Sequence, residues 1–166
     1  MIVIADTTPL ISLMKIGRLE LLEILFGKVL IPEAVHQELV VNPLFEKETR
    51  EINECEFIHV VSAIDERAVT LLRKATGLDS GESAAIVLTD EQQADLLLMD
   101  EVKGRNIARQ MGIRIMGTIG ILMIALEKGK MNYQEIAWSI DQLKDAGRHI
   151  KKELYDELMR EAEKFR

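Results

Sequence analysis

The sequence predicts an α/β fold in which helices cover both faces of a parallel sheet. Short apolar runs of strand length alternate with helical segments along most of the chain. Residues 96–99 are wholly apolar and are flanked by acids, as expected of a strand buried on both faces. The 166 residues are also enough for one continuous core without disulfides or metal staples. We therefore expect one α/β sandwich with additional helices at its carboxyl end.

The first half of the chain supplies three of the five expected strands. They are residues 2–5, 29–31 and 57–61. Thr8 is expected to cap the first helix, because Pro9 suits the first helical position, where its missing N–H costs nothing. A second short helix ends at Gly27, and Pro32 opens the helix after the second strand. The polar residues 46–56 are expected to form an exposed helix.

The second half supplies the two remaining strands. The expected elements are a helix over 65–75, a helix around 84–88, a strand at 96–99, a helix over 102–111, a strand at 113–116 and three more helices. No tract rich in Gly, Pro or Ser divides the chain. We expect residues 1–130 to form the sandwich and residues 131–166 to form a helical extension packed on the same domain.

Composition and charge exclude several classes of protein. Cys55 is the only cysteine, which excludes an internal disulfide framework and fits a reducing cytoplasm. No apolar run approaches the roughly 18 residues that span a bilayer, and Asp6 interrupts any signal-type segment at the amino terminus. The net charge of −7 disfavours nucleic-acid binding by charge alone. It does not exclude a site where bound metal ions reverse the local charge.

Four acids follow a pattern that predicts a metal site. Asp6 and Asp100 come directly after two apolar strands, and sites in parallel sheets form at such carboxyl ends. Glu38 lies on the helix after the second strand, and Glu82 lies in the first turn of the helix before the Asp100 strand. Crowded carboxylates raise one another's pKa unless a cation is present, and hard oxygen ligands suit Mg²⁺ or Mn²⁺. Such ions orient water and stabilise charge on a phosphodiester, so we expect these four acids to be both metal ligands and catalytic residues.

Each acid taken alone also has a structural explanation. Asp6 and Asp100 suit helix caps, and Glu38 suits a solvated helix face. The segment "DSGE" at residues 79–82 matches a capping box in which Glu82 reaches back to the backbone of Asp79. The ordered combination of the four acids is what favours the metal site.

Four segments of the chain together resemble the PIN domain family. They are "VIADTTPLI", "IPEAVHQEL", "LDSGESAAI" and "LLLMDEVKGRNIA", and they follow one another in the family's order and approximate spacing. They are similar above all to a prokaryotic, largely archaeal subgroup of stand-alone PIN-like proteins, over residues 1–126. The resemblance implies a three-layer α/β/α sandwich with strand order about 3-2-1-4-5. It also implies a nuclease dependent on Mg²⁺ or Mn²⁺, acting most often on RNA, and many members are toxins of toxin–antitoxin pairs.

The resemblance matches the family's four acids, in order, to Asp6, Glu38, Glu82 and Asp100. Asp is more usual at the third position. The chain also departs from the family at Leu98, where many members have Thr or Ser two residues before the last acid. The missing hydroxyl removes one potential contact to metal or phosphate, which bears on catalytic strength more than on the fold.

Hydroxyl and basic side chains beside the acids are candidate substrate contacts. Thr7 and Thr8 stand where the family has a hydroxyl or amide next to its first acid. Lys103, Arg105 and Arg109 follow the last acid, and the two arginines are four residues apart on one helix face, where they can bind phosphates. A solvated basic face that pairs with nearby acids is the alternative. We expect the two threonines, Lys103 and Arg105 to contact the substrate.

The expected function is therefore an endoribonuclease that hydrolyses RNA phosphodiester bonds, with a toxin of a toxin–antitoxin pair as the narrower reading. The alternative is a non-catalytic binding or regulatory module on the same fold, which Leu98 and the acidic charge favour. A phosphotransfer function of the receiver or phosphatase type is disfavoured. It requires a second acid close to Asp6 in sequence, and the segment "DTTPL" at residues 6–10 has none. The expected partners are RNA, a small antitoxin protein and a second copy of the chain. The amphipathic helices after residue 130 suit packing on their own domain or on such a partner.

Overall fold

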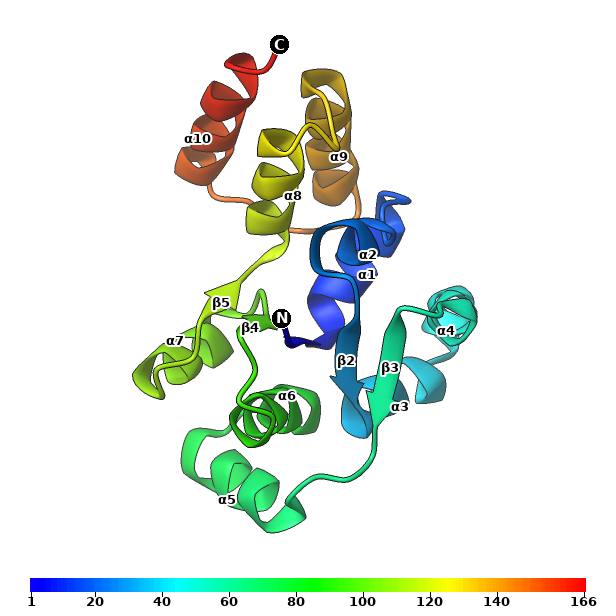
Figure 1. Ribbon diagram of the computed structural model, residues 1–166, viewed down its shortest axis with the longest axis vertical. Coiled ribbons are helices and arrows are strands. Elements are labelled where there is room, and N and C mark those ends of the chain that lie inside the picture. The colour runs from blue at the N-terminus through cyan, green and yellow to red at the C-terminus, as the bar shows by residue number, and fades with distance from the viewer.

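A five-stranded parallel sheet lies at the centre of the computed structural model, which describes residues 1–166 (Figure 1). Its strands are β1 (Val3–Ala5), β2 (Val29–Pro32), β3 (Ile58–Val61), β4 (Leu96–Leu98) and β5 (Ile115–Met116). They are hydrogen-bonded in the order β3-β2-β1-β4-β5, and every neighbouring pair is parallel. This confirms the predicted parallel sheet and its strand order, and it makes β1 and β4 neighbours.

Ten α-helices surround the sheet. They are α1 (Thr7–Lys15), α2 (Leu21–Phe26), α3 (Glu33–Val41), α4 (Glu46–Glu54), α5 (Glu66–Thr76), α6 (Ser80–Glu91), α7 (Val102–Gln110), α8 (Thr118–Glu127), α9 (Tyr133–Asp145) and α10 (Lys152–Glu163), with a 3-10 helix η1 (Pro43–Phe45) before α4. The predicted start of the first helix is wrong: its N-cap is Asp6, not Thr8. Pro9 is then the third helical residue, whose N–H would also lack a partner within the helix. None of the helices combines the length and the apolar composition needed to cross a membrane.

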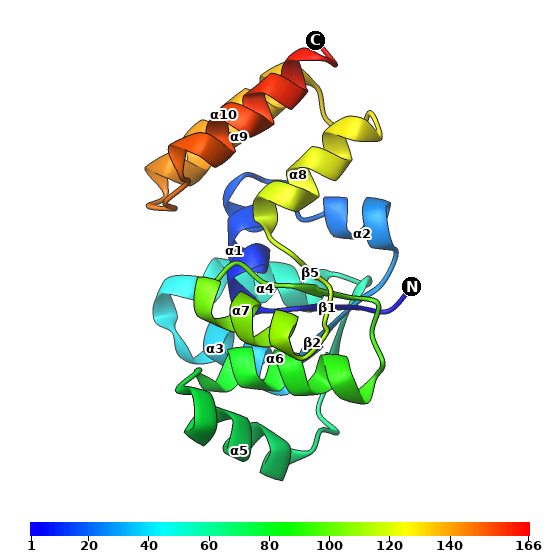
Figure 2. The ribbon, with the colours of Figure 1, turned by 90° about the vertical axis from the view of Figure 1, so that its left-hand side faces the viewer.

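Side chains of the central strands alternate between two cores, one on each face of the sheet. Val3 and Ala5 belong to a cluster of 27 buried residues that includes positions on α1, α2 and α8. Ile4 points to the other face, into a cluster of eight buried residues that includes Leu97 and Ile86. Figure 2 shows the sheet between α1, α2 and α8 on one side and α5 and α6 on the other. The fold is thus the predicted three-layer α/β/α sandwich, with the central strands buried on both faces.

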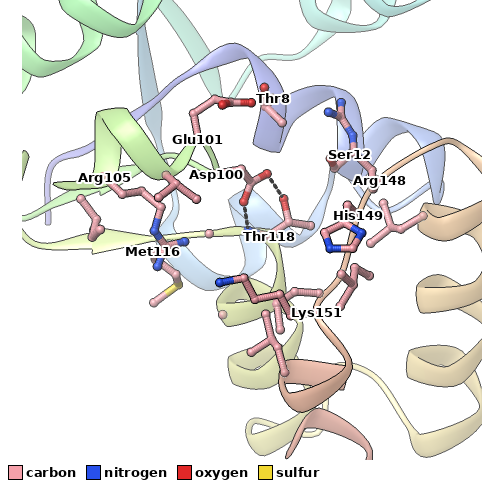
Figure 3. A pocket seen from close by; sticks show the side chains of 18 of the residues that line it. Thr8, Ser12, Asp100, Glu101, Arg105, Met116, Thr118, Arg148, His149 and Lys151 are labelled. Atoms are coloured by element: carbon pink, nitrogen blue, oxygen red, sulfur yellow. Dashed lines mark hydrogen bonds between the residues drawn. The ribbon is translucent and has the colours of Figure 1, made fainter. Parts of the chain in front are cut away.

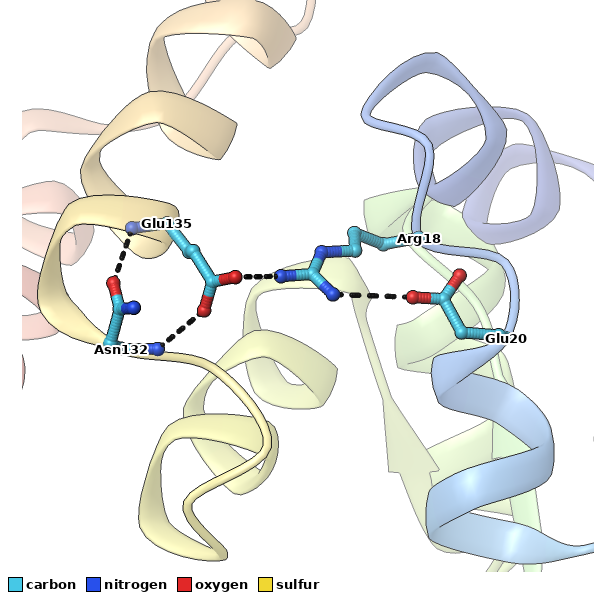
Figure 4. A network of polar contacts seen from close by, with 4 residues as sticks. All are labelled: Arg18, Glu20, Asn132 and Glu135. Carbon is cyan, nitrogen blue, oxygen red and sulfur yellow. Dashed lines mark hydrogen bonds and ion pairs between the residues drawn. The ribbon is translucent and has the colours of Figure 1, made fainter.

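The carboxyl-terminal helices share the larger core. α9 and α10 contribute the buried side chains of Ile136, Ile140, Leu143, Leu158 and Ala162. Arg18, in the turn before α2, bonds to Glu20 and to Glu135 on α9, where Asn132 and Glu135 form a capping box (Figure 4). Partly exposed ion pairs contribute only about 0–1 kcal/mol, so apolar burial is the main attachment of these helices. The division of the chain at residue 130 stays a prediction.

Leu97→Ala should destabilise the protein strongly. The side chain is fully buried in the smaller core, and removing it leaves a cavity that the surrounding strands and helices cannot fill. The expected loss is about 3 kcal/mol, or about 6–12 °C in melting temperature, measured by thermal unfolding. Leu71→Ala on α5 is the matched control, because 69% of Leu71 is exposed and its truncation should change stability by less than about 0.5 kcal/mol. Similar losses in the two variants would contradict the assigned core.

Candidate active site

β1 and β4 end side by side, and an acid follows each of them. Ala5 is paired with Leu98, and the N–H of Asp6 donates a hydrogen bond to the carbonyl of Leu98 at 2.9 Å. Asp6 and Asp100 therefore lie at the same edge of the sheet, where its carboxyl ends open toward α1, α7 and α8. Sites in doubly covered parallel sheets form at this edge.

The carboxylate of Asp6 is almost wholly buried, with 3% of the residue exposed. Asp6 is the N-cap of α1, but its side chain makes no capping hydrogen bond, and the third residue of the helix is Pro9, which has no N–H to offer. Burial raises the pKa of Asp6 to about 8, with smaller increases from Glu38 and Glu82, and the N–H of Thr7 only partly offsets them. Helix capping thus does not account for this acid.

Glu38 is held against the start of α1. The hydroxyl of Thr7 donates a hydrogen bond to Glu38 Oε2 at 2.6 Å. A Cβ on Gly81, in the first turn of α6, would collide with Glu38 Oε1, so glycine leaves the room this carboxylate occupies. Burial raises the pKa of Glu38, while hydrogen bonds from Thr7 and from the backbone of Gly81 lower it. Glu38 is therefore a half-buried carboxylate fixed by contacts with two other helices, and not a freely solvated side chain.

Glu82 takes part in the capping box that its sequence suggested. Its N–H donates to Asp79 Oδ1 at 2.8 Å, and its Oε2 accepts from the N–H of Asp79 at 3.0 Å. Burial, Asp79, Glu101 and Glu38 all raise the pKa of Glu82. One carboxylate oxygen caps α6, and the other makes no hydrogen bond within the protein.

Asp100 is bound by Thr118 at the start of α8. The N–H of Thr118 donates to Oδ1 at 2.7 Å, and its hydroxyl donates to Oδ2 at 2.6 Å (Figure 3). Asp100 thus satisfies the first N–H of α8 and does not cap α7, whose N-cap is Glu101. The sequence prediction does not include Thr118. Its position directly after β5, the strand next to β4, places it at the same edge of the sheet and is the signal that identifies it.

The structure brings three of the four predicted acids into one group. Asp6, Glu38 and Glu82, together with Asp79, form what we call the acidic cluster, because each acts on the pKa of another member. Asp100 is at the same edge, but it is not among the residues that shift the pKa of Asp6. No three carboxylate or imidazole groups are arranged as a ready metal-ligand set. Glu38 accepts a hydrogen bond from Thr7, and Glu82 accepts one from the backbone of Asp79.

A cavity of about 810 Å³ opens beside Asp100. Its wall includes Thr8, Ser12, Glu101, Arg105, Thr118 and residues 147–151 between α9 and α10. The two threonines predicted as substrate contacts lie in different sites. Thr7 donates a hydrogen bond to Glu38 in the acidic cluster, whereas Thr8 lines the cavity. No member of the acidic cluster lines the cavity, whereas Asp100 does.

The three basic residues of α7 that the sequence suggested as substrate contacts lie in different surroundings. Arg105 is half-buried in the cavity wall, and burial and Arg109 lower the pKa of its guanidinium while Asp100 raises it. Arg109 is exposed and donates to Asn106 at 3.3 Å. Lys103 is exposed near Gly77 and does not line the cavity. Of these three, only Arg105 adjoins Asp100.

Leu98 belongs to the core. Its side chain is fully buried in the larger cluster, on the face of the sheet opposite Leu97. Its carbonyl accepts the hydrogen bond from Asp6, so the residue serves the candidate site through its backbone.

Comparison with known proteins agrees with this architecture. A family model described as a PIN domain matches residues 2–164, a range that includes all ten α-helices. No curated protein matches the chain. The family match rests on nearly the whole sequence, whereas the resemblance noted above rests on four segments.

Asp6→Asn should stabilise the metal-free protein at alkaline pH. The pKa of Asp6 is about 8 in the folded protein, against 3.8 for an ordinary Asp, so folding binds a proton across that window. Stability therefore falls as pH rises from 4 to 8, and Asn avoids this loss because it never ionises. In EDTA we expect a gain of about 5 kcal/mol at pH 9, or about 10–20 °C in melting temperature, that disappears near pH 4. A gain of equal size at both pH values would contradict the assignment.

Proposed function

The chain belongs to the PIN domain family, whose members are generally metal-dependent nucleases, and on this premise we propose that it is a Mg²⁺- or Mn²⁺-dependent endoribonuclease. The observation that carries the proposal is the acidic cluster at the carboxyl edge of β1. A carboxylate as buried as Asp6, with two glutamates beside it, is costly to ionise unless a cation is present.

The chemistry of the cluster fits a hard divalent cation. Carboxylate oxygens are the ligands that Mg²⁺ and Mn²⁺ prefer, and Asp6, Glu38 and Glu82 would hold the ion, with Asp100 nearby. Glu82 keeps one oxygen without a hydrogen bond inside the protein, and that oxygen is the one free for a cation. When bound, the ion would supply stabilisation of the charge that develops on the phosphodiester and would acidify a water.

The residues around the cluster have separate tasks in this proposal. The hydroxyl of Thr7 orients Glu38, and Thr118 orients Asp100 on the cavity wall. Hydrolysis forms a bond from a water oxygen to phosphorus and breaks the P–O bond to the leaving ribose oxygen, which takes up a proton. In this proposal Asp100 accepts the proton that the attacking water releases. Arg105 would bind a phosphate oxygen next to Asp100. These positions agree with a strand that runs through the cavity past Asp100.

The narrower role that we propose is the toxin of a toxin–antitoxin pair in the cytoplasm. Val41, Leu44 and Trp138 leave large apolar surfaces exposed, at 71%, 83% and 52%. Val41 and Leu44 are close in sequence, at the end of α3 and in η1, and in this proposal they and Trp138 are the side chains that an antitoxin or a second copy of the chain would cover. Cys55 is a free thiol, in keeping with a reducing compartment.

A binding or regulatory module on the same fold is the second candidate function. It is favoured by the capping box that occupies one oxygen of Glu82, and by the absence of a ready set of three metal ligands. Such a module would bind a metal ion or RNA without turnover.

Asp6→Asn should abolish RNA hydrolysis. With Mn²⁺ and a mixed-sequence RNA, we expect cleavage to fall at least about 100-fold, because the variant removes the central carboxylate of the cluster. Asp141→Asn, at an exposed position of α9, is the matched control and should cleave as the unmodified protein does. Equal activity in all three proteins would exclude the acidic cluster as the active site. Stabilisation by Mn²⁺ with no hydrolysis of any RNA would instead favour the binding module.

Gly81→Ala should impair metal binding while the protein stays folded. The added Cβ would displace the Glu38 carboxylate from its place beside Thr7, but it enters a helical position that tolerates Ala. We expect the increase in melting temperature caused by Mn²⁺ to shrink, and cleavage to fall about 10- to 100-fold. Ser80→Ala, one residue earlier on the same turn, is the control. If both variants behave alike, the position of Glu38 does not matter to the site.

A further inference from the structure

The cavity beside Asp100 is lined in part by residues far along the chain. Residues 147–151, which we call the basic segment, connect α9 to α10 and carry Arg148, His149 and Lys151. We propose that the basic segment binds the phosphate backbone of single-stranded RNA and guides the strand past Asp100. The proposal rests on the nuclease function above and adds Arg148 and Lys151 to it as substrate-positioning residues.

The basic segment and Asp100 line the same cavity. In the view of Figure 3, Asp100 and Thr118 lie between Arg105 on one side and Arg148 and His149 on the other. All of these residues line the same space, and so does Lys151. A strand bound to both walls would therefore place a phosphate next to Asp100.

The cations of this cavity make no ion pairs. Arg148, Lys151 and Arg105 have no carboxylate oxygen within 4.0 Å, although Asp100, Glu101 and Glu157 share the lining. Five other cations of the 21 in the chain pair with glutamates, namely Lys15, Arg18, Arg50, Lys164 and Arg166. What distinguishes Arg105, Arg148 and Lys151 is that they gather at one cavity without an ion pair, so their N–H groups are available to the phosphates of an anionic ligand.

The cavity suits one strand better than a duplex. Its volume of about 810 Å³ lies near the upper end of the roughly 300–1,000 Å³ typical of ligand sites. A cavity of this size can hold a few nucleotides of one strand. Met116, Met123 and Leu154 add apolar wall against which unpaired bases can pack, and the imidazole of His149 is the one aromatic ring present. Sites for single strands combine a basic groove with rings on which bases stack, and His149 is the residue of this cavity that can serve in that way.

The test measures binding separately from cleavage. Binding of a fluorescent single-stranded RNA of mixed sequence is followed by anisotropy in EDTA over a series of salt concentrations. Arg148→Gln/Lys151→Gln is compared with the unmodified full chain and with Lys47→Gln/Arg50→Gln. The control pair also loses one Lys and one Arg, but from the exposed face of α4, beside β3 at the opposite edge of the sheet from β5 (Figure 1). Melting temperatures verify that all three proteins are folded.

We expect the double variant of the basic segment to bind about tenfold more weakly. Its affinity should also depend less steeply on salt, with a slope reduced by about 1.4, because each phosphate contact to a single strand contributes about 0.7. The control pair should keep both the affinity and the slope. Unchanged binding by the double variant, or no RNA binding by the unmodified protein, would overturn the proposal. Weakened binding together with no cleavage by the unmodified protein would overturn the nuclease function and leave the strand-binding site in place.

Discussion

The burial of the Asp6 carboxylate at the end of β1 is the constraint around which the site is arranged. The backbone of Asp6 is held by its hydrogen bond to Leu98 where the two central strands pair, and its carboxylate is buried there. An ionised carboxylate in this position is costly, and Glu38 and Glu82 increase the cost. The sheet provides the rigidity that holds these charges close together, and a divalent cation is the ligand that best relieves them.

The same interactions that end and begin helices also organise the site. Glu82 caps α6 through one carboxylate oxygen, and Asp100 accepts the first N–H of α8. These acids are therefore structural and functional candidates at once, and neither role excludes the other. Thr7 and Thr118 act alike, since each hydroxyl fixes a carboxylate that comes from another element. Helix termini that meet at one edge of the sheet supply this set of donors and acceptors.

The helices after residue 130 matter to the site through packing. Their apolar side chains complete the larger core, and this attachment brings residues 147–151 to the cavity beside Asp100. Asp100 and Glu101 from the end of β4 and cations from the carboxyl end of the chain thus face one space. The net charge of −7 therefore gives no sign of the basic side chains that gather at this cavity.

The sequence by itself determined the parallel sheet, most helices, and the position of Asp6 and Asp100 at strand ends, because these depend on local apolar runs and on turn residues such as Gly27 and Pro32. It also contained the capping box at residues 79–82, which is a local motif. Only the tertiary structure decided that Thr118 binds Asp100, that Leu98 faces the core, and that Arg105 and Lys103 diverge. It alone brought the basic segment to the cavity. These arrangements depend on contacts between residues far apart in the chain, and local periodicity carries no information about which side chains such contacts bring together.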